Sequence, residues 1–315
     1  MHFFPVFAKK HFMKRTKHKN INGWLIIDKP QGMGSTDVVN TTRRLLNANK
    51  NGHAGTLDPF ATGVLPIAFG EATKIIPFVT DGNKAYEFTL KFGAATNTDD
   101  IEGEITQTSS FIPSKEEILK ILPSFIGEIE QTPPMYSAIK INGERAYKLA
   151  RAGQEIDMPK RTVRIFSLEL SNQTAPDSFH FKVSCSKGTY VRALGRDIAL
   201  KLNTVGHLTE LRRTKCGFFC IDDTILLENF KNMVYESAWQ DSLLPIQTPL
   251  RDIAALAVSA EDAVKLRLGQ GLSAQKYGVL GSAQTLAAAY DGDCLTALVR
   301  IDGKKISPIR VFNLT

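Results

Sequence analysis

The chain has 315 residues, of which 43% are hydrophobic and 23% are charged. This composition excludes an intrinsically disordered protein, and the length suffices for one large domain or for two. The chain contains no apolar run long enough to span a bilayer, so we expect no membrane-spanning segment.

The net charge of +7 comes mostly from the start of the chain. Residues 1–20 hold six Lys or Arg and no acid, which leaves 33 basic and 32 acidic residues in the rest. We expect residues 1–20 to form a disordered basic arm. A weak organelle-targeting segment and a misassigned start codon fit the same acid-poor composition. Any surface for a polyanion must therefore come from local clusters of charge further along the chain.

The four cysteines predict neither a zinc site nor a disulfide framework. They show no CxxC pair and no histidines at matching spacing. A reducing cytoplasm is therefore the expected compartment. The cysteines are Cys185, Cys216, Cys220 and Cys294.

A strand, a loop and a helix are predicted first. Residues 23–28 are mostly apolar and indicate a buried strand, which ends in the turn Lys29-Pro30-Gln31-Gly32. Ser35 stands where an N-cap would begin a helix that runs to about residue 47. Three further elements follow: an apolar run at 64–69, a helix at 71–79 and a half-buried strand at 86–92.

The middle of the chain mixes helices and strands. Ser114 and Glu117 form a capping box, which predicts a helix that ends near Pro123. This helix belongs to an acidic segment, residues 87–130, with three basic and nine acidic residues, which we expect to be solvated. Strands at 163–170 and 179–185 and a helix at 191–202 follow, so the fold class is α+β.

A linker at residues 245–249 separates a second, smaller module from this α+β part. A helix is predicted at 260–268, with short strands at 296–301 and 309–312. We therefore expect a catalytic or binding domain over residues 21–247 and a small β-rich domain over 248–315.

Two basic stretches occur in the larger domain. Residues 140–164 hold seven basic and three acidic residues, and residues 182–215 hold eight basic and two acidic residues. If they fold together, they form one groove for a polyanion. The side chains that we expect to contact phosphates are Lys140, Arg145, Arg151, Arg212, Arg213 and Lys215.

The segment GHAGTLDPFATGVLP, residues 52–66, places three glycines and two prolines around one carboxylate, Asp58. Asp followed by Pro is a common helix start, with Asp as N-cap. A cap needs no such glycines, however, and Pro59 restricts the backbone of Asp58 to extended angles, which would preorganise a catalytic carboxylate. The chain has no GxxxxGK[ST] loop for nucleotide phosphates. Both interpretations of Asp58, helix cap and catalytic acid, fit the residues alone.

This segment resembles the signature loop of the TruB family, the tRNA pseudouridine-55 synthases, and Asp58 matches the family's single essential aspartate. The resemblance extends from residue 23 to about residue 215, with the motifs in family order. The other matching segments are GWLIIDKPQGMGSTD (23–37), KAYEFTLKFG (84–93), PPMYSAIKINGERAYKLARAG (133–153), CSKGTYVRALGRDIA (185–199) and LRRT (211–214).

The resemblance implies a pseudouridine-synthase fold, with a mixed, largely antiparallel sheet flanked by helices, and a PUA-like C-terminal domain. It also implies isomerisation of a uridine in the T loop of tRNA by a monomer that needs no cofactor, metal or protein partner. One carboxylate suits this reaction because the departing uracil is retained, whereas glycoside hydrolysis usually uses two carboxylates. Asp58 either attacks C1′ or removes the C2′ proton, and both routes require its ionised form.

Five further site residues follow from the resemblance. Arg192 would pair with Asp58 and keep it deprotonated. Tyr86 would stack on the flipped base, and Tyr190 and Leu211 would line the pocket with it, which offsets the cost of extruding the base. His53 would stack on or hydrogen-bond to RNA rather than transfer a proton.

The resemblance leaves the role of the first motif open. Lys29 and Pro30 either form a structural turn that supports the loop of Asp58 or contact RNA, and we expect no catalytic role for Lys29. A guide-RNA-dependent relative that modifies ribosomal RNA shares the aspartate loop. A tRNA chaperone that only flips the base would also use stacking and basic patches. The motifs PFATGVLPI and EATK and the Asp58–Arg192 pair favour a standalone enzyme.

Overall fold

The computed structural model describes residues 18–137, 139–141, 143–154, 157–279 and 281–314. Most of the expected basic arm, residues 1–17, lies outside this part. Among the helices of the described residues, none has the length and apolar character needed to cross a bilayer.

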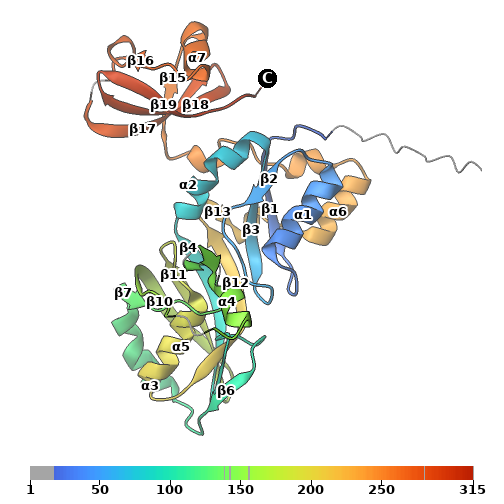
Figure 1. Ribbon diagram of the computed structural model, residues 1–315, viewed down its shortest axis with the longest axis vertical. Helices are drawn as coiled ribbons and strands as arrows, with labels where there is room; N and C mark the ends of the chain where they lie inside the picture. The colour runs from blue at the N-terminus through green and yellow to red at the C-terminus, as the bar shows by residue number, and fades with distance from the viewer. Residues whose placement is uncertain (1–17, 138, 142, 155–156, 280, 315) are drawn as a thin grey trace, which may run out of the picture.

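The larger domain is built on one mixed sheet, whose strands run in the order β14-β1-β3-β12-β4-β11-β10-β7 (Figure 1). Within this sheet β1 pairs in parallel with β14, and β3 with β12, while the other neighbours are antiparallel. The predicted α+β fold with a largely antiparallel central sheet is therefore confirmed. The bounds are β1 Gly23–Lys29, β3 Thr62–Phe69, β4 Lys84–Phe92, β7 Gly127–Gln131, β10 Arg161–Ala175, β11 Ser178–Cys185, β12 Gly206–Cys216 and β14 Ile225–Leu226, with β2 Asn51–His53 on β3 and β13 Phe219–Cys220 on β12.

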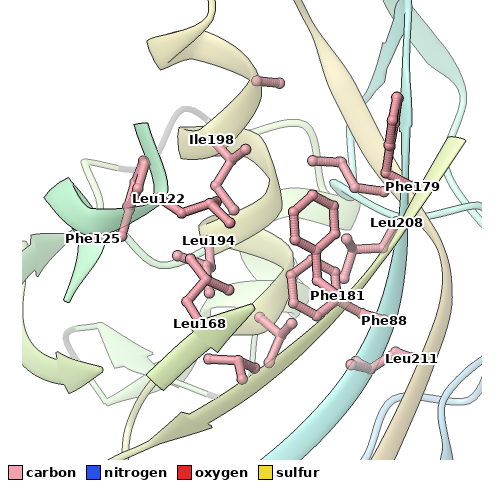
Figure 2. Close-up of a cluster of buried hydrophobic side chains, with 14 of the residues drawn as sticks. Phe88, Leu122, Phe125, Leu168, Phe179, Phe181, Leu194, Ile198, Leu208 and Leu211 are labelled. Atoms are coloured by element: carbon pink, nitrogen blue, oxygen red, sulfur yellow. The ribbon is translucent and has the colours of Figure 1, made fainter. Parts of the chain in front are cut away.

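Helices pack on this sheet at two places. Near β1 and β3, helices α1 (Ser35–Leu46) and α6 (Leu227–Tyr235) lie side by side and share a core that contains Val38 and Phe230 (Figure 1). Near β4, β11 and β12, helix α5 (Val191–Lys201) packs on a cluster in which the rings of Phe88 and Phe181 stack at 5.1 Å (Figure 2). This cluster packs against β4 and β12, which carry several of the candidate site residues.

The start of α1 differs from the sequence prediction by one residue. Gly34, not Ser35, is the N-cap, and the carboxylate of Asp37 accepts a hydrogen bond from the Gly34 backbone N–H. The Ser35 hydroxyl instead bonds to both backbone polar groups of Leu57. The prediction of Ser35 as N-cap was wrong because its side chain is occupied by this longer-range contact.

The other predicted elements are present with changed lengths. The capping box of Ser114 and Glu117 begins α3, and α5 begins one residue after Tyr190. The predicted helix at 71–79 is a 3-10 helix followed by a short α-helix. The remaining elements of the domain are η1 Gly70–Ile75, α2 Ile76–Asp81, β5 Ala94–Thr96, β6 Ile105–Thr108, α3 Lys115–Ile121, η2 Leu122–Phe125, β8 Lys140–Ile141, β9 Glu144–Arg145, α4 Ala146–Arg151, η3 Ile221–Asp223, η4 Trp239–Ser242 and η5 Thr248–Leu250.

A separate five-stranded sheet with one helix forms the predicted small β-rich domain, at one end of the molecule (Figure 1). Its strand order is β15-β17-β18-β19-β16. Phe312 belongs to the same buried cluster as Trp24 of the larger domain, and the backbone N–H of Asn313 donates to the Glu71 carboxylate at 2.8 Å. The bounds are β15 Ala254–Ala257, α7 Ala260–Arg267, β16 Leu272–Ser273, η6 Gln275–Tyr277, β17 Gly281–Asp291, β18 Cys294–Gly303 and β19 Lys305–Val311.

Candidate active site

Asp58 lies in the connection between β2 and β3, which pair in antiparallel register with His53 opposite Ile67. No helix begins at Pro59; the Asp58 carbonyl accepts a hydrogen bond from the Ala61 backbone N–H at 3.2 Å, which closes a turn. The interpretation of Asp58 as a helix cap is therefore wrong. The carboxylate retains 35% of its accessible surface and is free of any capping contact with the following backbone.

Buried side chains from the first motif hold this loop on both sides of Asp58. The hydroxyl of Ser35 bonds to the N–H and the carbonyl of Leu57 at 2.8 and 2.9 Å. The Lys29 ammonium, which is fully buried, donates to the carbonyls of Pro30, Met33 and Pro59 at 2.9, 2.5 and 3.1 Å. Burial lowers the pKa of Lys29 to about 8. Of the two interpretations of Lys29, the structure supports the structural turn.

Arg213 supports the same loop from β12. Its guanidinium donates to the carbonyls of Val64, Gly55 and Thr56, at 2.8, 3.0 and 3.4 Å, and only 1% of the residue is exposed. The prediction that Arg213 contacts phosphate was therefore wrong. Because Arg213 approaches the loop so closely, a side chain at Gly63, whose φ is +100°, would meet its backbone.

Arg192, in the first turn of α5, connects Asp58 to a second carboxylate. Its Nε lies 2.9 Å from Oδ2 of Asp58, and its Nη1 lies 3.2 Å from Oδ2 of Asp100. Its remaining donors bond to the carbonyls of Thr98 and Tyr136 at 2.7 and 2.8 Å. The planar guanidinium therefore has four partners in fixed directions, and Asp58 meets it in one orientation.

Asp100 is a site residue that sequence reasoning missed. It lies in the acidic segment that we expected to be solvated, yet only 3% of it is exposed. Its Oδ1 accepts from the Thr98 hydroxyl at 2.6 Å and from the Glu102 backbone N–H at 3.0 Å, so its second oxygen is free to bind Arg192. The sequence signal was limited to two adjacent acids before a glycine turn, and nothing in that pattern indicates Arg192.

The electrostatics around Asp58 combine opposing effects. Burial raises the pKa of the Asp58 carboxyl above its ordinary value, and the negative charge of Asp100 raises it further. The charge of Arg192 and its hydrogen bond oppose this rise, with a smaller contribution from Lys29. The ion pair thus favours the ionised form of a carboxylate that burial alone would tend to protonate.

Asp58 opens into a cavity of about 650 Å³, here called the basic cavity. Tyr86, Tyr190, Arg192 and Leu211 all lie on its wall with Asp58. Among its described lining residues Asp58 is the only carboxylate. The basic residues of the wall are Lys84, from β4, and five residues that come from the two basic stretches of the sequence, Lys160, Arg161, Lys187, Arg192 and Arg213.

Two tyrosines on the wall of the basic cavity belong to a strand and to the start of a helix. Tyr86 lies on β4 between Val183 of β11 and Arg213 of β12, and burial raises the pKa of its phenol, so the group is neutral. Tyr190 is the N-cap of α5, and its backbone N–H and carbonyl are both bonded to the Gln131 side-chain amide, at 2.8 and 3.1 Å. Such anchored rings offer flat apolar surfaces to a planar ligand.

His53 is the predicted site residue that does not line the cavity. It ends β2, three residues before Thr56, and its Nδ1 is buried without a hydrogen-bond partner. Burial and the nearby charge of Arg213 lower its pKa, so the ring is neutral. The structure therefore brings together five of the six predicted site residues and leaves His53 beside them.

A second cavity, here called the acidic cavity, adjoins the first. Its volume is about 740 Å³, and it shares Thr56, Asp58, Ser137 and Arg192 with the basic cavity. Its other walls carry Asp100, Glu102 and Glu104 together with Tyr136, Tyr147 and Arg151. Asp58 therefore lies at the junction of two hollows of opposite charge.

The remaining predicted phosphate contacts differ in exposure. Lys140, Arg145, Arg151 and Lys215 are exposed. Arg212 is instead paired with Asp28 through both carboxylate oxygens, at 2.6 and 3.1 Å. At the rim of the basic cavity, Arg161 lies over the Tyr190 ring at 5.5 Å, a residue that the sequence prediction did not single out.

Two solved structures share this fold over most of the chain. A Cbf5-Nop10-Gar1 complex contains a chain that is 25% identical, with a TM-score of 0.69, over 93% of this chain and 84% of that one. An H/ACA RNP bound to a substrate RNA containing 2′-deoxyuridine gives a TM-score of 0.71 at 22% identity, over 92% of this chain and 85% of that one.

Comparison with family models and relatives is more specific. The family model described as TruB family pseudouridylate synthase (N terminal domain) matches residues 43–191, and that of the tRNA pseudouridylate synthase B C-terminal domain matches 192–251. The tRNA pseudouridine synthase B of Caulobacter vibrioides is 47% identical over 96% of this chain and 99% of its own length. That of Rhodospirillum rubrum is 45% identical over the same shares of both chains. The chain therefore belongs to the TruB family of pseudouridine synthases, which are isomerases.

Proposed function

We propose that this enzyme isomerises the uridine at position 55 in the T loop of tRNA, with Asp58 as its essential carboxylate. The ion pair between Asp58 and Arg192, at 2.9 Å on the wall of the basic cavity, is the observation that carries this proposal. The cavity offers one carboxylate among six basic side chains, which suits a polyanionic substrate and a reaction that needs a single acid.

The target base would enter the basic cavity after it leaves the stack of the T loop. Stacking on an aromatic ring returns about 1–3 kcal/mol per base, and Tyr86 is placed on the cavity wall to provide it. This gain offsets part of the few kcal/mol that flipping costs. Tyr190 and Leu211 line the same wall and exclude water from the base. His53, beside the loop, would contact a neighbouring nucleotide of the same RNA.

The chemistry breaks the bond between C1′ and N1 of the uridine and forms a bond between C1′ and C5. The proton on C5 leaves to solvent, and N1 gains one, so no other reactant is consumed. Asp58 would either attack C1′ or remove the C2′ proton, and each route needs a carboxylate that is ionised and close to the ribose. Arg192 maintains both conditions through its charge and its fixed direction.

The remainder of the tRNA would contact exposed parts of the molecule. Lys160, Arg161 and Lys187 border the basic cavity, and Lys140, Arg145 and Lys215 are exposed elsewhere on the same domain. The small C-terminal domain would hold the acceptor stem. Under this proposal one chain, without a guide RNA or a protein partner, performs the reaction in the cytoplasm.

Tritium release tests the proposal with the purified chain alone. Unmodified tRNA that carries uridine tritiated at C5 should release one equivalent of tritium, and tRNA with cytidine at position 55 should release none. Release from that variant tRNA would contradict modification at position 55. No release from either tRNA would contradict pseudouridine-synthase activity. Release that requires added guide RNA and partner proteins would indicate a guide-dependent enzyme. Tight binding of tRNA without release would indicate a chaperone.

A further inference from the structure

Ser137 carries a hydroxyl that takes no part in the hydrogen bonds around Asp58 and Arg192. Only 4% of the residue is exposed, and its Oγ is buried without a hydrogen-bond partner. Among the described residues, one other side-chain atom is in this state, Nδ1 of His53. A buried hydroxyl without a partner costs about 1–3 kcal/mol, so its retention at this position calls for a function.

The backbone around Ser137 is fixed, so the hydroxyl can change its position only by rotation about the Cα–Cβ bond. The Ser137 N–H donates to the Met135 carbonyl at 2.9 Å, and its carbonyl accepts from the Tyr147 N–H at 3.1 Å. The preceding carbonyl, that of Tyr136, accepts from Arg192 at 2.8 Å. Ser137 is thus tied to the residue that orients Asp58.

The phenol of Tyr190 is the protein group that could serve as a partner for the Ser137 hydroxyl. A donor at Ser137 would hold the pKa of Tyr190 down against the effect of burial, which raises it. The two oxygens nevertheless do not meet the geometry of a hydrogen bond. In the free protein the Ser137 hydroxyl is therefore near Tyr190 and unpaired.

Ser137 lies where the two cavities meet. It belongs to the wall of both the basic and the acidic cavity, as do Thr56, Asp58 and Arg192. A base held in the basic cavity must place its ribose beside Asp58, because either route brings that carboxylate to C1′ or to the C2′ proton. The sugar and its phosphates, all rich in oxygen, would then occupy the junction next to Ser137.

We propose that the Ser137 hydroxyl hydrogen-bonds to a sugar–phosphate oxygen of the target nucleotide and fixes its ribose against Asp58. This inference rests on the proposed function and adds a binding residue to it. The bound RNA supplies the partner that the free protein lacks. The oxygen that Ser137 binds is either the 2′-hydroxyl or a phosphate oxygen, because both can form a hydrogen bond with a serine hydroxyl.

Ser137→Ala tests this proposal through rate and stability together. The single-turnover rate at subsaturating tRNA should fall roughly three- to tenfold, the effect of one lost hydrogen bond. The melting temperature should stay equal to that of the wild type or rise, because no protein partner is lost. Ser178→Ala is the matched control: it removes a buried serine hydroxyl, bonded to Asp177 at 2.8 Å, from a residue on the wall of neither cavity. The control should keep the wild-type rate.

A double-mutant comparison separates contact with RNA from an effect through Tyr190. In a Tyr190→Phe background, Ser137→Ala should reduce the rate by the same factor as in the wild type. Loss of that factor in the Phe background would show that the serine acts on the phenol and would overturn the proposal. A wild-type rate for Ser137→Ala, or a fall in melting temperature that accompanies the fall in rate, would overturn it as well.

A modified substrate identifies the oxygen. With T-arm RNA that has a 2′-deoxyuridine at the target, binding by the wild type and by Ser137→Ala should be equal if the 2′-hydroxyl is the partner. A persistent difference in binding would assign a phosphate oxygen. Either result supports a sugar–phosphate contact, whereas equal binding by both proteins to the unmodified RNA contradicts it. An inactive wild-type chain would instead refute the proposed function itself, and this inference with it.

Discussion

The loop that carries Asp58 and the segment formed by residues 139–141 and 143–151 both border the acidic cavity, but different kinds of contact hold them in place. Buried side chains of Lys29, Ser35 and Arg213 bond to the backbone of the loop. Residues 139–141 and 143–151 are organised by backbone hydrogen bonds of the hairpin β8–β9 and of α4, and Lys140 and Arg145 are exposed. The proposed function accounts for this difference, because the Asp58 carboxylate would need a fixed position for the reaction, whereas contacts to a flexible RNA backbone would tolerate adjustment.

Among substitutions near the loop of Asp58, Arg192→Lys should reduce the single-turnover rate most. Lysine keeps the charge but cannot bind Asp58, Asp100 and two carbonyls at once. We expect the single-turnover rate to fall by about a hundredfold or more, with tRNA affinity changed only a few fold. Arg164→Lys, at an exposed residue of β10, is the control. A rate within tenfold of the wild type would show that the planar geometry of the Arg192 guanidinium is unimportant for the reaction.

Lys29→Met tests whether the support beneath the loop is structural. Methionine fills similar space but leaves three carbonyls without their donor, so the free energy of unfolding should fall by about 2–4 kcal/mol. The pKa of Lys29, about 8, is below its ordinary 10.5, so the unfolded chain binds more protons between these values. Wild-type stability from this group therefore rises as pH increases through that window.

Urea unfolding of both proteins at pH 7 and pH 10 measures this difference directly. The gap in unfolding free energy between wild type and Lys29→Met should be larger at pH 10. An unchanged or smaller gap would mean that the lysine is not buried as the structure has it.

The structure also shows which parts of the site the sequence could predict. The strand before Lys29, the glycine-rich loop and the helix that starts after Tyr190 all carry local patterns, and they occur where predicted. These patterns depend on near neighbours in the chain. The family resemblance then brought Asp58 and Arg192, 134 positions apart, into one hypothesis, and in the structure they form an ion pair.

The errors concern side chains whose partners are distant. Arg213 was assigned to phosphate because it lies in a basic stretch, but Gly55, Thr56 and Val64 present three carbonyls to it. Ser35 was assigned as a cap because it precedes a predicted helix, but its hydroxyl bonds to Leu57, 22 positions away. Asp100 was assigned to a solvated segment because only the folded chain brings Arg192 beside it. Local sequence contains none of these contacts.

Asp100→Asn separates orientation from charge. Loss of one partner of Arg192 should loosen Asp58 and lower the single-turnover rate at neutral pH by about tenfold. Because the charge of Asp100 raises the pKa of Asp58, its removal lowers that pKa. The ionised form is the active one, so the loss of rate on acidification should begin at lower pH in the variant. A pH–rate profile of both proteins checks this, and a shift to higher pH would contradict it.

Lys215→Ala should have the smallest effect on tRNA binding and rate, because Lys215 is exposed and lies on the wall of neither cavity. One lost phosphate contact should weaken tRNA binding a few fold and reduce the slope of log affinity against log salt by about 0.9. The rate at saturating tRNA should stay unchanged. Lys115→Ala, an exposed lysine in the acidic segment, should change neither quantity. A large loss of saturating rate in Lys215→Ala would assign that lysine to the reaction itself.

Asp58→Asn tests whether the Asp58 carboxylate is essential for the reaction, because asparagine keeps the size of the side chain and removes its charge. The measurement is the single-turnover rate with saturating T-loop substrate, together with the affinity for the same RNA. We expect an affinity within a few fold of the wild type and a rate reduced by about a thousandfold or more, since both routes require the ionised carboxylate. A variant that isomerises uridine within tenfold of the wild-type rate would contradict it.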